Sequence, residues 1–434
     1  MRETECGTPS MRSTLSFFLP LALTSAMTMV SHSLISAGLA RTVNPVASLA
    51  AYSVALATED LFESPIIQTR QMTLALLRGP RSFKIISRVA ATALLISLAL
   101  GLLVAATPLG PIVFSRVLGV PNELLQPTLH NFWIVMLLPI LAGARSFFQG
   151  VVIRYRQTHV ITTAMVGRVA LMAGFIYSCV RWGWIKGGYI GSIALNVGVL
   201  VELAAAAAKS RKLLSEHREE DDRALTDRSA WRFYYPLAIA AVLASTAKPW
   251  VTAGIARRSE AAAALAAYSV AWSVGSILIN PMQNIHQTTL VMGRGPNGDQ
   301  HVRRFALAAG CSSAGLLLIL SLSPLGHFIL TDWIGVSDTL LTLTLRNLRV
   351  MAVLPLIISC VEYLMGQMLA KSLTRVISTA KVANLLATMA AVSLLARRSA
   401  VVGPLSLIIG AATELAALAW GWYRSNEVGG AARG

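Results

Sequence analysis

Stretches of about twenty apolar residues, each long enough to cross about 30 Å of hydrocarbon as a helix, recur along the 434-residue chain. The chain is 55% hydrophobic and only 13% charged, whereas about a quarter of the residues of a typical soluble domain are charged. We therefore predict an all-α membrane protein with about twelve transmembrane helices. The predicted helices start near Leu15, Val46, Lys84, Thr128, Thr158, Gly187, Trp231, Ala261, Val302, Leu343, Leu373 and Val401.

The charge of the chain lies mostly in the loops between these stretches. The 37 Lys and Arg residues outnumber the 20 Asp and Glu residues, which gives a net charge of +17. Basic residues concentrate in every second connection, at residues 78–88, 154–156, 209–228, 294–304 and 371–381. Cytoplasmic loops carry such an excess and contact anionic lipid headgroups. We therefore expect both termini in the cytoplasm, a bacterial inner-membrane location, and membrane lipids rather than nucleic acid as partners.

An internal repeat divides the chain into two halves. The segment LAAYSVA at residues 49–55 recurs at residues 265–271, and AGLAR at residues 37–41 recurs as AGIAR at residues 253–257. The shift of 216 residues is the same in both cases. Because each copy holds an even number of predicted helices, the copies have the same orientation in the membrane. The sequence predicts two parallel six-helix lobes, residues 12–208 and 231–426, joined by a cytoplasmic linker, residues 209–230.

Prolines recur in the repeat as well. Pro65 and Pro281 are partners in the second helix of each copy, and Pro139 and Pro355 are partners in the fourth. A proline inside a helix removes one backbone hydrogen bond, and in lipid the freed carbonyl needs a partner or a water-filled cavity. These pairs predict kinks, either beside a central cavity or as plain shaping of the lobe interface. Two further partner segments, residues 108–125 and 324–341, predict short interfacial helices.

The second predicted helix carries acidic residues that the second copy lacks. Glu59, Asp60 and Glu63 lie within it, and their repeat partners are Gly275, Ser276 and Ile279. Charged side chains inside a span are costly and mark ion or substrate pathways by default. We interpret the three carboxylates as a cation-coupling site for Na⁺ or H⁺, the only cofactor we expect. The alternative is that Glu59 and Asp60 lie near a helix end and are solvated in the headgroup region.

Cationic side chains inside the spans predict a cavity for an anionic substrate. A buried Lys or Arg needs a counter-ion, which is either a protein carboxylate or a bound anion. The alternative is structural pairing, for instance of Arg145 or Arg168 with Glu362, a residue that we also place among the coupling candidates. Glu202 and Glu414 are repeat partners once a short deletion in the last helix is allowed, and for them we expect a shared structural role. The residues predicted to line the cavity are His32, Arg70, Arg145, Arg168, Lys248 and His286.

No motif in the sequence predicts an enzyme. The sequence lacks a nucleotide-binding loop, a nucleophile elbow and a metalloprotease motif. The four cysteines, Cys6, Cys179, Cys311 and Cys360, have neither disulfide-framework nor zinc-site spacing. We expect no enzymatic activity and no bound metal other than the coupling ion.

Three short motifs resemble a known family. FFLPLALT (residues 17–24), LAAYSVA (residues 49–55) and FYYPLAI (residues 233–239) resemble the MATE-like exporters of the multidrug/oligosaccharidyl-lipid/polysaccharide (MOP) superfamily, and most closely their progressive ankylosis branch. The resemblance covers nearly the whole chain and implies a two-lobed, V-shaped fold with alternating access. That branch is implicated in export of pyrophosphate, nucleotide or citrate anions. Many MATE exporters couple transport through an acidic residue on the first helix, where this chain has His32 and no carboxylate.

These observations predict a monomeric secondary active transporter that exports a small anionic or amphipathic solute. A flippase of a lipid-linked glycan is the alternative within transport. A non-transporting membrane scaffold or regulator is the alternative outside it.

Overall fold

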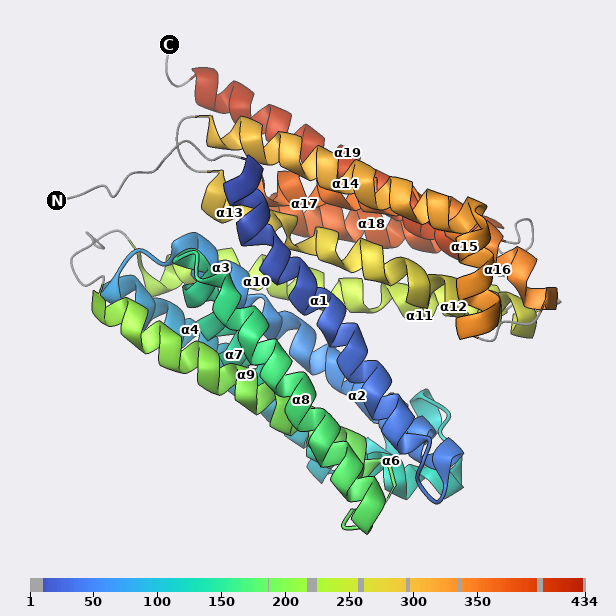
Figure 1. Cartoon of the computed structure of the whole chain (residues 1–434). Helices are drawn as coiled ribbons and strands as arrows, with labels where there is room; N and C mark the ends of the chain where they lie inside the picture. The colour runs from blue at the N-terminus through green and yellow to red at the C-terminus, as the bar shows by residue number, and fades with distance from the viewer. Residues whose placement is uncertain are drawn as a thin grey trace. The chain divides into compact units, whose positions relative to one another are not determined.

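The computed structural model describes residues 11–185, 187–216, 225–256, 261–293, 297–334, 338–395 and 401–431. Within these ranges the regular structure is entirely helical (Figure 1). In the first half the helices are α1 (Met11–Leu39), α2 (Pro45–Ile67), α3 (Thr69–Leu76), α4 (Pro80–Ala106), α5 (Leu109–Ile112), η1 (Val113–Val117), α6 (Asn122–Val135), α7 (Leu138–Arg154), α8 (Thr158–Trp182) and α9 (Tyr189–Glu216). In the second half they are α10 (Asp227–Ser245), α11 (Ala247–Ala256), α12 (Ala261–Ile279), η2 (Asn280–Asn284), α13 (Ile285–Met292), α14 (Gly298–Leu322), α15 (Pro324–Phe328), η3 (Ile329–Trp333), α16 (Asp338–Met351), α17 (Leu354–Ala370), α18 (Thr374–Leu395) and α19 (Val402–Ala431).

Every predicted span corresponds to one helix or to consecutive helices separated by a short break. Among the described residues, 11 helical stretches are long and apolar enough to cross a membrane. The predicted span outside this set is α2 with α3, which contains the three carboxylates Glu59, Asp60 and Glu63. The protein is therefore an integral membrane protein, as the apolar stretches predicted.

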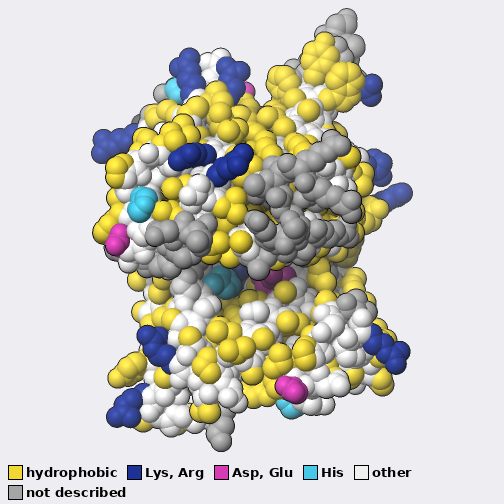
Figure 2. All heavy atoms as spheres, turned by 90° about the vertical axis from the view of Figure 1, so that its right-hand side faces the viewer, with side chains coloured by type: hydrophobic (Ala, Val, Ile, Leu, Met, Phe, Trp, Pro, Cys, Tyr) yellow, Lys and Arg dark blue, Asp and Glu magenta, His cyan; other side chains and the backbone are white. Residues whose placement is uncertain are grey.

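The outward faces of the long helices carry large apolar side chains. Leu95 on α4 is 65% exposed and Ile319 on α14 is 60% exposed. Figure 2, which faces the side of the molecule where several helices end, shows hydrophobic side chains there mixed with other atoms, and Lys and Arg side chains in separate spots. Soluble monomers rarely expose contiguous apolar surface on this scale. These faces fit contact with lipid chains.

The recurring prolines break their helices, as predicted. Pro65 lies two residues before the end of α2, and Pro281 lies in the 3₁₀ segment η2. Pro139 and Pro355 each lie in the first turn of α7 and α17, where a proline needs no intrahelical partner for its nitrogen. The second helix of each copy is thus kinked, and the fourth helix is divided into two segments.

Two compact units divide the chain at positions that differ from the predicted lobes. One unit comprises Leu23–Val242, and the other comprises Met1–Ala22 with Leu243–Gly434. The start of α1 therefore belongs with the second copy, and the start of α10 belongs with the first. Of the predicted linker, residues 209–216 continue α9, residues 227–230 begin α10, and residues 217–224 lie outside the described part. The predicted lobe boundaries follow the sequence repeat, whereas the compact units exchange these half-helices.

Side-chain contacts explain this exchange. On α10, the Tyr234 hydroxyl donates to the carbonyl of Pro65 at 2.9 Å, at the kink of α2. The side-chain amide of Asn284 donates in turn to the carbonyl of Leu21 on α1 at 3.4 Å. The rings of Phe18 and Phe305 also meet edge to face, with centroids 5.1 Å apart. Each opening half-helix thus packs against the kinked second helix of the other copy.

A glycine in the fourth helix permits close contact with the second helix in each copy. A Cβ on Gly150 would lie 2.7 Å from Thr73 Cβ, and a Cβ on Gly366 would lie 2.5 Å from Thr289 Cβ. Gly150 and Gly366 are repeat partners, as are Thr73 and Thr289. Small residues allow this approach between helices in lipid, where packing replaces the hydrophobic effect as the main attraction.

We expect Gly150→Ala and Gly366→Ala each to lower the free energy of unfolding by about 1–3 kcal/mol, because the new methyl groups overpack the contact. Thermal unfolding of the purified protein in detergent measures the change. Gly174→Ala on α8 is the matched control, because nothing lies within 4 Å of its Cβ position. The control should be neutral or slightly stabilising, since alanine favours helix. Equal effects at all three positions would contradict this packing.

Candidate functional site

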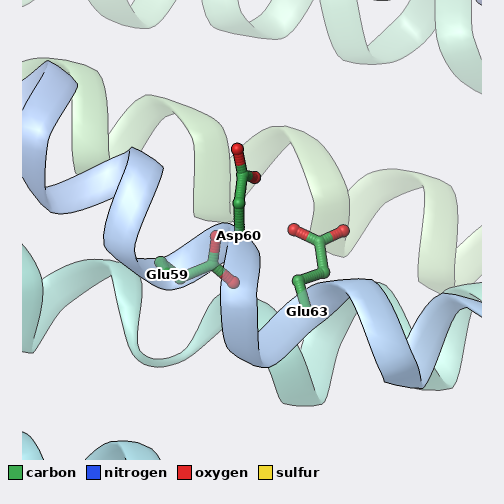
Figure 3. A group of neighbouring side chains, drawn as sticks. All are labelled: Glu59, Asp60 and Glu63. Atoms are coloured by element: carbon green, nitrogen blue, oxygen red, sulfur yellow. The ribbon is translucent and has the colours of Figure 1, made fainter. Parts of the chain in front are cut away.

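The three carboxylates of α2 lie close together in the structure. Glu59, Asp60 and Glu63 each offer an oxygen, and these oxygens lie within 4.8 Å of one another. Figure 3 shows all three rising from neighbouring turns of α2, with Asp60 and Glu63 pointing to the same side. Glu63 follows Asp60 by three residues and Glu59 by four, so on the helix surface it neighbours both. The structure therefore brings together the predicted coupling residues of the first copy.

The three carboxylates differ in their surroundings. Glu59 is 0% exposed, Glu63 is half-buried and Asp60 is exposed. Neither carboxylate oxygen of Glu59 has a hydrogen-bond partner among the described residues. A buried ionised group without a partner costs several kcal/mol, so such a group takes up a proton or binds a cation. Binding of a proton or a cation would therefore stabilise Glu59 in its buried position.

Arg145 on α7 contacts two glutamates. Its guanidinium Nη2 lies 3.9 Å from Glu63 Oε1, and its Nη1 lies 3.4 Å from Glu202 Oε2. Glu202, on α9, also accepts from Arg168 Nη1 at 2.6 Å and from Gln149 Nε2 at 3.2 Å. Glu202 is thus bound by three donors, whereas Glu63 has one loose ionic contact. A chain of charges runs from the α2 carboxylates through Arg145 to the buried pair of Arg168 and Glu202.

This geometry changes the predicted partners of the two arginines. The sequence offers Glu362 as a structural partner for either arginine, whereas Arg145 and Arg168 both contact Glu202 in the structure. Helices four, five and six of one copy pack together, and the sequence repeat alone does not give the rotation of each helix about its axis. That both arginines face a substrate stays a prediction.

Glu362 pairs with another predicted residue. Its Oε2 lies 2.6 Å from His286 Nδ1, and both side chains are buried. A residue predicted for the substrate cavity and one predicted for cation coupling thus form a single pair. His286 on α13 is the repeat partner of Arg70 on α3. Equivalent positions in the two copies therefore hold different chemistry.

The second copy has its own buried glutamate, Glu414, for which the sequence predicted the same structural role as for its repeat partner Glu202. Glu414 on α19 accepts from Lys381 Nζ and from Asn384 Nδ2, each at 2.6 Å. Asn384 is the repeat partner of Arg168. In both copies, the fifth helix thus donates to a glutamate on the sixth. Lys381, which the sequence places at the end of a basic loop, lies within α18.

The remaining predicted residues are more dispersed. His32 is half-buried on α1, and Arg70 is half-buried on α3, where it interacts electrostatically with Arg145, Glu63 and Glu202. Lys248 belongs to α11, but its side chain lies outside the described part of the structure. The sequence analysis missed Gln149, which lies one helical turn after Arg145, and the partners Lys381 and Asn384. For Asn384, the repeat register itself was the available signal.

Solved structures with the same fold are transporters. A MOP superfamily transporter from Pyrococcus furiosus Vc1 (DSM3638), whose reversed pocket polarity suggests a different function for that protein, matches with a TM-score of 0.76 at 13% identity, over 98% of both chains. An outward-facing multidrug resistance MATE family transporter matches with a TM-score of 0.71 at 13% identity, over 98% of both chains. A Vibrio cholerae MATE transporter mutant matches with a TM-score of 0.69 at 14% identity, over 96% of this chain and 97% of that one.

Fold and membrane helices together define an integral membrane protein with the MATE-type architecture of the solved MOP superfamily transporters. The family model described as Progressive ankylosis protein (ANKH) matches residues 3–207 and 224–428. The chain belongs to the progressive ankylosis protein family. This confirms the resemblance seen in the short motifs.

We expect Arg168→Met to lower the free energy of unfolding by about 3–5 kcal/mol, because it removes the donor that lies closest to the buried carboxylate of Glu202. Thermal unfolding in detergent provides the measurement. Arg88→Gln is the matched control, since the pair of Arg88 and Asp227 is exposed and such a pair contributes at most about 1 kcal/mol. A loss no larger than that of the control would show that the Arg168 contact contributes little.

Proposed function

We propose that the protein is a secondary active transporter that exports a small anionic or amphipathic solute by alternating access, coupled to a cation at the α2 carboxylates. The observation that carries this proposal is Glu59, a fully buried carboxylate next to Asp60 and Glu63 that has no hydrogen-bond partner in the part of the chain that the structure describes. Fold stability would constrain both copies alike, yet the second copy has Gly275, Ser276 and Ile279 at these positions. The difference between the copies supports a functional role for the cluster.

The preference for an anion rests on the cations near this cluster. Arg145 is half-buried and Arg70 lies within its electrostatic range. Of the two glutamates that Arg145 contacts, Glu202 is bound by several other donors, whereas Glu63 lies 3.9 Å from Arg145. A guanidinium forms strong, directional hydrogen bonds with carboxylate and phosphate groups. Arg145 and Arg70 are therefore the cations of the first copy best placed to meet an anionic solute.

Transport in proteoliposomes tests the proposal. Uptake of labelled phosphate, pyrophosphate, citrate and ATP is measured with an imposed Na⁺ or H⁺ gradient and without one. We expect at least one of these anions to accumulate with a cation gradient, and Glu59→Gln to reduce that stimulation by about tenfold, within the range of coupling between two binding sites. Asp332→Asn, on the exposed surface of η3, is the control and should transport like the wild type.

Two outcomes would redirect the proposal. Movement of a labelled lipid headgroup across the bilayer, without anion uptake, would favour a lipid-linked glycan flippase. Gradient-stimulated uptake that is unchanged in Glu59→Gln would remove the α2 carboxylates from the coupling mechanism. The proposed orientation, with both termini in the cytoplasm of a bacterial inner membrane, is tested separately by reporter fusions to each end.

A further inference from the structure

Arg145 holds its two glutamates unequally, and this inequality suggests which contact can open. On the Glu202 side, loss of Arg145 would still leave Arg168 at 2.6 Å and Gln149 at 3.2 Å. On the Glu63 side, the contact is a single one of 3.9 Å, beyond hydrogen-bond distance. Separating Arg145 from Glu63 therefore breaks no hydrogen bond, whereas Glu202 is held in place in either case.

The carboxylates on the other side of Glu63 are arranged for a metal cation. Oxygens that bind a common cation of calcium's size at about 2.4 Å lie at most about 4.8 Å apart, and the three carboxylates meet this limit. A proton alone would leave Glu59 with a buried O–H group, and its oxygens have no hydrogen-bond partner among the described residues. A cation among the three carboxylates would give Glu59 a partner.

Sodium fits this site better than a divalent ion. Arg145 already places one positive charge beside the cluster, and Arg70 and Arg168 also interact electrostatically with Glu63. A monovalent ion adds less repulsion against these cations. It is also released more readily, which a transport cycle requires.

We propose that Arg145 and Na⁺ compete for Glu63. Without Na⁺, the guanidinium contacts Glu63; when Na⁺ binds among Glu59, Asp60 and Glu63, the guanidinium leaves Glu63 and keeps its contact with Glu202. This competition deepens the proposed function and rests on it for its role in transport.

Equilibrium binding of ²²Na⁺ to the purified full-length protein tests this competition without any solute. Ionic strength is kept constant with choline chloride. We expect Arg145→Gln to tighten Na⁺ binding about tenfold, because a tethered competing charge is removed. Glu63→Gln should weaken binding by at least the same factor, because it removes one ligand. The matched control is Arg88→Gln, which removes an exposed positive charge from the same compact unit, Leu23–Val242. This variant should bind Na⁺ like the wild type.

A second measurement uses the wild-type protein, so it does not depend on folding of the variants. Dicyclohexylcarbodiimide modifies carboxyl groups in apolar surroundings, and mass spectrometry quantifies the modification of Glu59 and Glu63. Sodium, but not choline, should slow this labelling. Absence of protection, absence of ²²Na⁺ binding, or unchanged Na⁺ affinity in a folded Arg145→Gln protein would each overturn the proposal. Because these measurements need no transport, Na⁺ binding without anion uptake would contradict the proposed function alone.

Discussion

Burial of charge within a bundle of membrane helices is the constraint on which this structure depends. An ionised side chain inside the bundle has no bulk water to solvate it, so its stability depends on the donors that neighbouring helices supply. Glu202 is bound by donors from α7 and α8, and Glu414 by donors from α18. These contacts fix the rotation of the fifth and sixth helices in both copies. The repeated scaffold is thus held by a repeated polar contact within an apolar interior.

The copies diverge where the second and fourth helices meet. The first copy has Arg70 and Arg145 in this region, together with the α2 carboxylates, whereas the second has the buried pair of His286 and Glu362. Close packing at Gly150 and Gly366 is nevertheless retained in both. The contact between backbones has therefore been preserved while its charged neighbours have changed. Such divergence lets one half of a duplicated fold acquire chemistry that the other half does not need.

The sequence predicts the helices well and the partners of their charges poorly. Apolar length, repeat register and Pro65 predict the spans and the kinks, because these depend on local covalent geometry and on solvation by lipid. Whether Arg145 meets Glu202 or Glu362 depends on the rotation and packing of several helices, which a single sequence does not encode locally. The carboxylates on α2 were predicted to cluster because one helix positions all three. The buried, unpartnered state of Glu59 needed the surrounding helices to be seen.

The crossed assignment of α1 and α10 bears on how such a protein arose and assembles. Phe18 and Leu21 complete the packing of one unit, and Tyr234 completes that of the other, so neither six-helix copy is self-sufficient. If a single six-helix copy existed as an ancestor, the first turns of its first helix would have packed in a second molecule, as in a domain-swapped dimer. After gene fusion, the same exchange of helix segments would take place within one polypeptide. During synthesis, the first half must accordingly wait for Tyr234 to emerge before its own bundle is complete.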